Sequence, residues 1–552
     1  MSAPLPRAGR PSREPELRSK LFCSMAQVLA LYVVALGLAL AAGRIPPDES
    51  WFLQVVNRLR HGEILYREVF CGITPLSVYV TWFFSKLFGL QLIVERAIIQ
   101  ACFVATVLLV LKICRQLGMP AGYQWPLAAA LLVYGQDRAS TTPYSPMAMV
   151  FMLLCFSLAL MWFYERIAVN SAATGMAPGW VTPGLAGLGA GLCFATKQNA
   201  GMLTLAALLA TVLIVSVAGH TGAKKALALM AVMFAGFLLA SSLVLFPVYL
   251  TGGIPGLLDY GFLGKGAYLQ HGGDWAAFRV LSPAMLLTEP GNPTAWKCLY
   301  MNILYLAPAI AASLLLVAWL RCKGTIRTLT LVVAVFTGAV MLLAFPRADA
   351  THMVLIFPAL MPAIVHGWQA ARLPFPPRFE WLFRALVWAW LGVGLGFLVL
   401  RPVAGLERGN YCASPFPCHQ GVLITPAMRA YWESQIQSLR RSAPGKRLFI
   451  LAYDAGFYYL TLGLQNPTPF DVPAATAFGR HGQKEVIAAI QQGKISEVCW
   501  KQEQIEEFEP DTLVQFIRAN MVQGPDAGPC TLYSLPAVDR ALPGADLNAP
   551  KR

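Results

Sequence analysis

Apolar runs long enough to cross a bilayer recur along the chain up to about residue 400, and they restrict the fold more than any other feature. A membrane-spanning helix needs about twenty apolar residues, and only helices or closed barrels satisfy all backbone polar groups in lipid. We therefore expect an α-helical polytopic membrane protein with about eleven transmembrane helices. The runs lie at 21–43, 93–115, 124–136, 146–164, 183–196, 200–219, 226–250, 299–320, 328–346, 353–369 and 384–400.

The composition agrees with a membrane protein. Of the 552 residues, 57% are hydrophobic and 13% are charged, about half the charged share of a soluble protein. The formal net charge is +15, but the basic residues form short clusters between apolar runs rather than one patch. Nucleic-acid binding, which uses a basic stripe or face, is therefore disfavoured.

The basic clusters also predict the topology. If the N-terminus is cytoplasmic, every second turn carries Lys or Arg, as the positive-inside rule requires. Omitting either short run (124–136 or 183–196) would break this pattern, so we keep both. The basic turns contain Lys112 and Arg115, Glu165 and Arg166, Lys224 and Lys225, Arg321, Lys323 and Arg327, and Arg372, Arg378 and Arg384. The topology predicts a multi-pass protein of the inner (plasma) membrane.

Four parts follow from this topology. Residues 1–20 are rich in Pro and Arg and are predicted to form a disordered cytoplasmic tail. Residues 21–400 form the transmembrane module, whose long outer loops are 44–92 and 251–298. Residues 401–540 are predicted to form a small periplasmic (extracytoplasmic) α/β domain, and 541–552 a disordered tail. The domain is expected to contain strands at 446–452 and 530–535 and helices at 482–493 and 510–521.

The first outer loop holds two predicted helices. Residues 51–59 have amphipathic spacing, and the aromatic stretch 76–88 carries one charge, Lys86. Both are predicted to lie at the membrane interface. The alternative is that 76–92 begins the next span.

The cysteines of the C-terminal region predict disulfides. If that region is extracytoplasmic, pairs Cys412–Cys418 and Cys499–Cys530 are plausible. The chain has no CxxC pair, so a zinc site is not expected.

Asp48 and Glu49 follow the first apolar run directly. A carboxylate at the membrane surface can accept the proton of an attacking hydroxyl group. The alternative is that Asp48 caps the helix that begins near Trp51, because Asp is a favoured N-cap residue.

The whole segment resembles the first outer loop of the GT-C glycosyltransferases, in the style of the bacterial protein-mannosyltransferase-like and lipid A aminoarabinose transferase-like enzymes. The resemblance rests on Asp48-Glu49, Gly62-x-x-x-Tyr66-Arg67, Thr74-Pro75-Leu76 and Leu87-Phe88-Gly89. It implies a GT-C-like catalytic module at 21–400. It assigns the general base or acceptor-orienting carboxylate to Asp48, with Glu49 beside it and Tyr66 and Arg67 as supporting residues.

Two further sites are suggested. The superfamily often has an acidic residue in the second outer loop, which maps to Asp137; its alternative is a surface pair with Arg138. Many GT-C enzymes have a Gly-rich run ending in Thr-Lys, here Gly184 to Lys197. Lys197 could bind the donor phosphate, or it could be a lysine that snorkels at a helix end.

A fourth stretch, from Pro346 to His352, resembles a turn of several GT-C relatives. Arg347 could bind a phosphate, with His352 beside it and Asp349 orienting either residue. The alternative is an interfacial ion pair and a structural histidine. Asp349 and His352 lack further ligands at useful spacing, so the sequence gives no support to a divalent metal, and no cofactor is expected to be required.

These observations predict an inverting transferase that moves a sugar from a polyprenyl-phosphate donor to a lipid, glycan or protein acceptor at the outer membrane face. The expected partners are that donor, the acceptor and membrane lipids. A transporter or flippase of lipid-linked sugars is the rival of another class, and a polysaccharide polymerase or ligase is a closer one. Oligosaccharyl transfer is disfavoured because the C-terminal region has no Trp-Trp-Asp motif.

Overall fold

The structure is a computed structural model of the chain. It describes most of 30–40, then 45–134, 142–171, 179–265, 293–345 and 350–371, a few residues from 385 to 392, and 404–536 except 406, 443–446 and 503–509.

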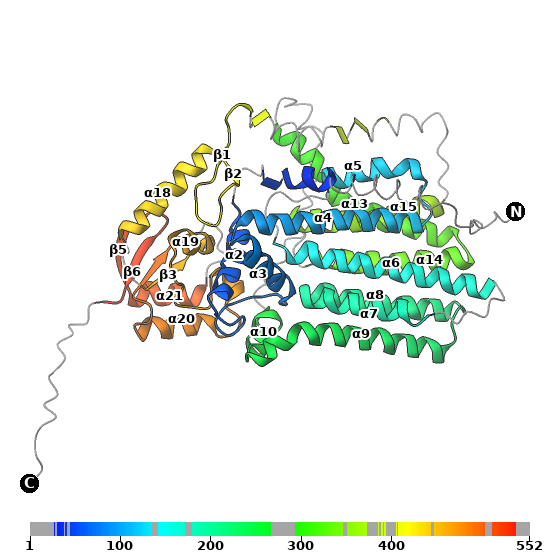
Figure 1. The fold of residues 1–552 in the computed structure, drawn as a ribbon, viewed down its shortest axis with the longest axis horizontal. Helices are drawn as coiled ribbons and strands as arrows, with labels where there is room; N and C mark the ends of the chain where they lie inside the picture. The colour runs from blue at the N-terminus through cyan, green and yellow to red at the C-terminus, as the bar shows by residue number, and fades with distance from the viewer. Residues whose placement is uncertain are drawn as a thin grey trace, which may run out of the picture.

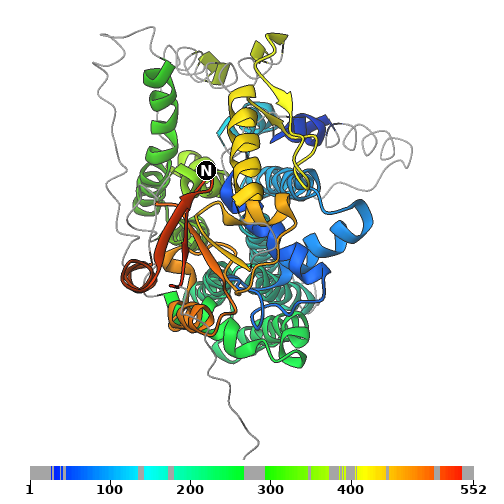
Figure 2. The same cartoon turned by 90° about the vertical axis from the view of Figure 1, so that its left-hand side faces the viewer.

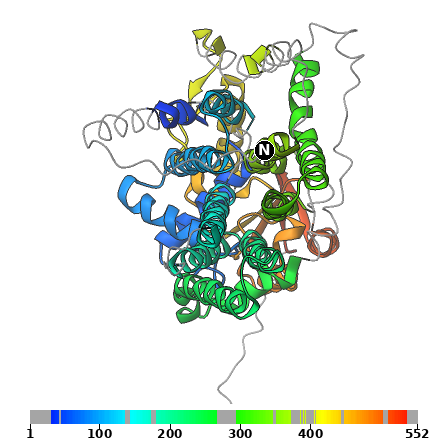
Figure 3. The same cartoon turned by 90° about the vertical axis from the view of Figure 1, so that its right-hand side faces the viewer.

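A bundle of long apolar helices forms the larger part of the molecule (Figures 1 and 3). Within the described residues, seven helices are long and apolar enough to cross a membrane. They are α4 (Leu92–Gln116), α6 (Tyr144–Ser171), α8 (Gln198–Val217), α9 (Ala223–Leu250), α13 (Pro293–Arg321), α14 (Gly324–Leu342) and α15 (Ala350–Ala371). The protein is therefore a multi-pass membrane protein.

Two expected spans appear as shorter helices. α5 (Gln124–Tyr134) has 11 residues and α7 (Val181–Thr196) has 16. The runs at 21–43 and 384–400 lie largely outside the described residues. Nine of the expected runs thus coincide with helices, while the count of eleven stays a prediction.

The glycines of α7 have a packing role. Atoms of α9 lie so close to Gly187 and Gly191 that a Cβ at either position would meet the backbone of Met233 or Phe237. Small residues at such positions allow two membrane helices to approach closely. The Gly-rich run that precedes Lys197 therefore packs α7 against α9.

The first outer loop forms α2 (Pro47–Arg60) and α3 (Leu76–Phe88), which lie between the bundle and the C-terminal domain (Figure 1). The interfacial prediction is wrong for α2, because buried residues occupy all its faces and it packs against C-terminal helix α19 (Ala455–Leu462). α3 buries small residues such as Ser77 and Ser85 and leaves Phe88 67% exposed, as expected at a membrane surface. It ends before Gly89, so it is a separate helix rather than the start of α4.

The C-terminal region contains a four-stranded sheet with the order β3-β4-β6-β5 (Figure 2). β3 and β4 are parallel, and the other two pairs are antiparallel. The predicted strands and helices of this region are confirmed. The elements are β3 (Leu448–Leu451), β4 (Glu497–Trp500), β5 (Val522–Asp526) and β6 (Thr531–Ser534), with α18 (Pro426–Ser442), α19, α20 (Gly482–Gln491) and α21 (Asp511–Asn520).

The remaining short elements lie in the loops. β1 (Cys412–Ala413) and β2 (Leu423–Ile424) form an antiparallel pair, and α10 (Ile254–Gly261) lies in the outer loop 251–298. Short 3₁₀ helices occupy Ala121–Tyr123, Leu263–Lys265 and Ala475–Ala477.

One of the two predicted disulfides is present. Cys499 of β4 is bonded to Cys530, next to β6. Cys412 and Cys418 are free thiols, because the pairing of β1 with β2 turns the Cys412 thiol toward the Ile424 carbonyl oxygen, 3.5 Å away.

The basic turn with Lys112 and Arg115 lies at the end of the bundle opposite the C-terminal domain. The Leu92 amide, at the start of α4, donates to the Cys418 carbonyl of that domain at 2.7 Å. Lys112 and Arg115 lie at the other end of this 25-residue helix, whose length is about 37 Å. For this turn and the first outer loop, the predicted separation is present in the described part of the chain.

Candidate functional site

Asp48 lies in the first turn of α2, where the first outer loop begins. Pro46 precedes the helix and Pro47 occupies its first turn. This position suits proline because the backbone N–H that proline lacks would make no hydrogen bond within the helix there. Asp48 is inside the helix and is not its N-cap, so the capping alternative is wrong. It is partly exposed, and its Oδ1 accepts a hydrogen bond from the Tyr453 hydroxyl at 2.9 Å. Tyr453 belongs to the C-terminal domain.

Glu49, the next residue, is buried and forms an ion pair with Arg96 of α4. The Arg96 NH2 group lies 2.7 Å from Glu49 Oε2, and Nε lies 3.2 Å from Oε1. The NH1 group donates to the Ala39 carbonyl oxygen at 2.9 Å. Glu49 is thus committed to a two-point contact that joins α2 to the bundle.

Ser50, the third residue, contacts a buried histidine of the C-terminal domain. Its hydroxyl lies 3.0 Å from His419 Nε2, and His419 Nδ1 lies 2.9 Å from the Pro417 carbonyl oxygen. Burial lowers the pKa of His419 to about 4. The Pro417 carbonyl raises this pKa and the positive charge of Arg96 lowers it, but both effects are smaller than that of burial. The imidazole is therefore neutral near pH 7, when one ring nitrogen donates and the other accepts.

Successive residues of a helix point about 100° apart. Asp48, Glu49 and Ser50 therefore face three directions, and each is held by a different segment of the chain. A further contact fixes the same turn, because the Trp51 backbone packs on Gly456 of α19 with no room for a Cβ. The backbone at Asp48 is consequently fixed. Of Asp48, Glu49 and Ser50, only Asp48 has a side chain that is partly open to solvent.

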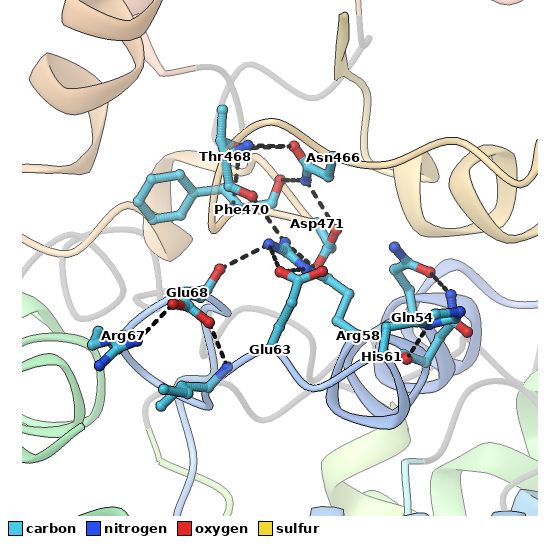
Figure 4. A network of polar contacts seen from close by, with 12 residues as sticks. Gln54, Arg58, His61, Glu63, Arg67, Glu68, Asn466, Thr468, Phe470 and Asp471 are labelled. Atoms are coloured by element: carbon cyan, nitrogen blue, oxygen red, sulfur yellow. Dashed lines mark hydrogen bonds and ion pairs between the residues drawn. The ribbon is translucent and has the colours of Figure 1, made fainter. Parts of the chain in front are cut away.

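The other end of α2 holds a closed ionic network (Figure 4). Arg58 uses all five of its N–H donors: two toward Glu63, one toward Asp471, and two toward the carbonyl oxygens of Thr468 and Glu68. Burial alone would lower the pKa of Arg58, but Asp471 and Glu63 outweigh it and raise the pKa. This network attaches the first outer loop to the C-terminal domain.

The structure gives Tyr66 and Arg67 different surroundings. Tyr66 is buried, has a positive φ of 67°, and donates its hydroxyl to the Ile73 carbonyl oxygen at 2.5 Å. Burial raises its pKa well above the usual value. Arg67 is exposed and lies 2.8 Å from Glu68. Tyr66 therefore shapes the loop, and Arg67 lies on its surface.

Lys197 lies at the break between α7 and α8, in extended backbone conformation. Its Nζ donates to the Ser145 hydroxyl at 3.0 Å and lies 5.5 Å from the centre of the Tyr144 ring. The neighbouring Gln198 donates to the Gly72 carbonyl oxygen at 3.1 Å. Lys197 thus lies beside the first outer loop, at the same end of the bundle as α2.

The other predicted residues are placed less fully. His352 is partly buried in the first turn of α15. Asp137, Arg347 and Asp349 lie outside the described residues. Among the residues that the structure does describe, no group of three His, Cys, Asp or Glu side chains could hold a metal ion.

The sequence analysis missed the partners that hold the first turn of α2. Arg96 carried a signal, since it and Glu95 are charges at the start of an apolar run. Tyr453 carried another, since it follows a predicted strand, and ligands gather at the carboxyl ends of parallel strands. His419 carried no signal, because its contact with Ser50 joins residues 369 positions apart.

Comparison with known proteins gives similarity in structure alone. No protein-family model matches the sequence, and no curated protein matches it. Among solved structures, ArnT from Cupriavidus metallidurans bound to undecaprenyl phosphate has a TM-score of 0.54 at 14% identity, covering 96% of this chain and 99% of ArnT. The chain has the GT-C fold.

A second neighbour has the same fold. The oligosaccharyltransferase from Archaeoglobus fulgidus, tethered to an acceptor peptide containing the NVT sequon, has a TM-score of 0.51 at 11% identity. The match covers 92% of this chain and 74% of that one. At identity this low, the match shows the fold alone, and its coverage includes both the bundle and the C-terminal region.

Proposed function

We propose that this GT-C protein is an inverting glycosyltransferase that moves a sugar from a polyprenyl-phosphate donor to a lipid, glycan or protein acceptor. The observation that carries the proposal is the environment of Asp48. It is a partly exposed carboxylate in a helical turn that separate contacts fix on its other sides. A general base needs this combination of access to substrate and fixed position.

The proposed step is a single displacement. The acceptor hydroxyl oxygen attacks the anomeric carbon, and its proton passes to the Asp48 carboxylate. The bond between that carbon and the phosphate oxygen breaks, and the polyprenyl phosphate leaves with the electron pair. Attack opposite to the leaving group inverts the configuration. Phosphate is a good leaving group, so the proposal includes no obligatory metal or cofactor.

Lys197 is the proposed contact for the donor phosphate. Its position beside the first outer loop is supported by two hydrogen bonds: Thr74 to the Phe194 carbonyl oxygen and Gln198 to that of Gly72. A cation near the departing phosphate stabilises the developing charge by about 3 kcal/mol. Arg347 and His352 are proposed to contribute at the same phosphate, with Asp349 orienting them, and Asp137 to face the acceptor.

We place the reaction at the outer face of the inner membrane, with the N-terminus cytoplasmic. Two observations support this orientation: the basic turn with Lys112 and Arg115 lies opposite the C-terminal domain, and that domain contains the Cys499–Cys530 disulfide. Disulfides persist in oxidising compartments such as the periplasm. The undecaprenyl phosphate in the ArnT structure supports a lipid-phosphate carrier for this chain as well.

The test is release of labelled sugar from a panel of synthetic polyprenyl-phosphate sugars by purified protein. We expect wild-type turnover with at least one donor and loss of turnover in Asp48→Asn. Asp511→Asn, a change at an exposed residue of α21, is the matched control and should remain active. Near-normal transfer by Asp48→Asn would remove the base assignment, and donor binding without transfer by the wild type would favour the transporter.

The Lys197 assignment has its own control. Lys197→Met should reduce turnover about 100-fold without changing the melting temperature. Lys86→Met changes a lysine that also lies over an aromatic ring, 5.3 Å from the centre of Trp82, but on the exposed face of α3. Equal effects of the two substitutions would contradict a phosphate-binding role for Lys197.

A further inference from the structure

The residues that follow β3 and β4 in the C-terminal domain are bonded to each other, and we refer to them together as one unit. Tyr453 and Asp454 follow β3, and Lys501 follows β4. The Lys501 amide donates to the Leu451 carbonyl oxygen at 3.1 Å, and its Nζ lies 3.2 Å from Asp454 Oδ2. These contacts fix the backbone around Tyr453 before any substrate binds.

This unit meets the first turn of α2. The Tyr453 hydroxyl donates to Asp48 Oδ1 at 2.9 Å. Three residues later in the chain, Gly456 lies against the Trp51 backbone, where a Cβ would come within 2.8 Å of the Trp51 Cα atom. The absence of a side chain at Gly456 therefore brings Tyr453 close enough to reach Asp48.

We propose that Tyr453 is a positioning residue for Asp48, so that the C-terminal domain completes the active site instead of serving as an accessory. This inference rests on the proposed function. A hydrogen bond donated to a carboxylate stabilises its charged form and makes it a weaker base. The gain from Tyr453 is therefore orientation: the bond selects one side-chain rotamer of Asp48 and holds it for the incoming hydroxyl group.

The two effects of the hydrogen bond can be separated by experiment. Tyr453→Phe leaves Asp48 more basic but without its orienting partner. We expect kcat to fall about 10- to 100-fold, in keeping with the loss of a hydrogen bond to a charged group. The acid limb of the pH–rate profile should move to higher pH, and the KM for the donor should change little because the donor phosphate lies elsewhere.

Tyr431→Phe is the matched control, because Tyr431 is 48% exposed on α18. It should leave both kcat and the pH profile unchanged. In an Asp48→Asn background, Tyr453→Phe should cause no further loss of turnover. The melting temperatures of Asp48→Asn, Tyr453→Phe and the double variant provide a readout that needs no activity, and the two single shifts should not add.

The outcomes separate the inference from the proposed function. The positioning role alone would be overturned if Asp48→Asn is inactive but Tyr453→Phe keeps the wild-type kcat and the wild-type acid limb of the pH–rate profile. Active Asp48→Asn would instead overturn the base assignment. If the wild type consumes no donor, strictly additive melting shifts would still contradict a functional Asp48–Tyr453 contact.

Discussion

The two ends of α2 carry charged residues in opposite situations. At its C-terminal end, Arg58 is buried and all five of its donors are bonded within the protein. At its N-terminal end, Asp48 is partly exposed, and the residues after it hold the backbone in place. Arg58 cannot bind a substrate, because it is buried and all its donors are already bonded. Asp48 can react, because its side chain is partly exposed on a turn whose backbone is fixed.

One helix thus combines an anchor with a reactive group. The Arg58 network attaches the first outer loop to the C-terminal domain (Figure 4). Tyr453 reaches Asp48 from the same domain. If this comparison is right, substitutions at the C-terminal end of α2 should reduce stability, and substitutions at Asp48 should reduce catalysis.

The largest loss of stability is expected from Arg58→Met. Removing the guanidinium leaves the Asp471 carboxylate buried without its cation, which costs about 3–5 kcal/mol of unfolding free energy. Urea-induced unfolding in detergent micelles would measure the change. Arg67→Met is the control: its pair with Glu68 is exposed, so we expect a loss of less than about 1 kcal/mol. Similar losses in the two variants would contradict the anchoring role.

A smaller loss is expected at the other end from Glu49→Gln, about 2 kcal/mol, because the buried Arg96 would lose its anion. Glu95→Gln provides a close comparison. Glu95 is buried next to Arg96, and neither of its carboxyl oxygens has a hydrogen-bond partner in the described part of the chain. This change should be neutral or stabilising. A reversed order of stability would show that Arg96 pairs with Glu95 instead.

At pH values below neutral, a further change in stability is expected from His419. Its pKa is about 4 in the folded state, below its ordinary unfolded value, so the unfolded chain binds the proton more readily. The stabilisation is complete above about pH 6.5 and is lost as the pH falls toward about 4, by about 1 kcal/mol per pH unit. His419→Gln should flatten this part of the stability profile relative to the wild type. An unchanged slope would contradict a neutral buried imidazole.

The sequence predicted those features that depend on local pattern. The apolar runs became helices because their length and composition are sufficient, and the strands near Leu448 and Thr531 followed from their β-branched and aromatic content. Asp48 was found because it follows an apolar run and matches a family pattern. The Cys499–Cys530 pair is also confirmed.

Features that depend on tertiary contacts were not predictable in this way. The spacing of 51–59 correctly indicated a helix, but it could not show that the C-terminal domain covers its second face. The contacts of Asp48 with Tyr453 and of Ser50 with His419 join residues 405 and 369 positions apart, and no local pattern records such contacts. Tyr66 matched the family pattern, yet its buried hydroxyl bonds the backbone of its own loop.

The most direct test measures sugar transfer and unfolding free energy on the same preparations of wild type and Asp48→Asn. We expect transfer to fall by about 100- to 10,000-fold, as for the loss of a general base. The unfolding free energy should change by about 1 kcal/mol or less, because Asp48 is partly exposed and the neighbouring contacts remain. A stable Asp48→Asn protein that transfers sugar at the wild-type rate would contradict the central claim.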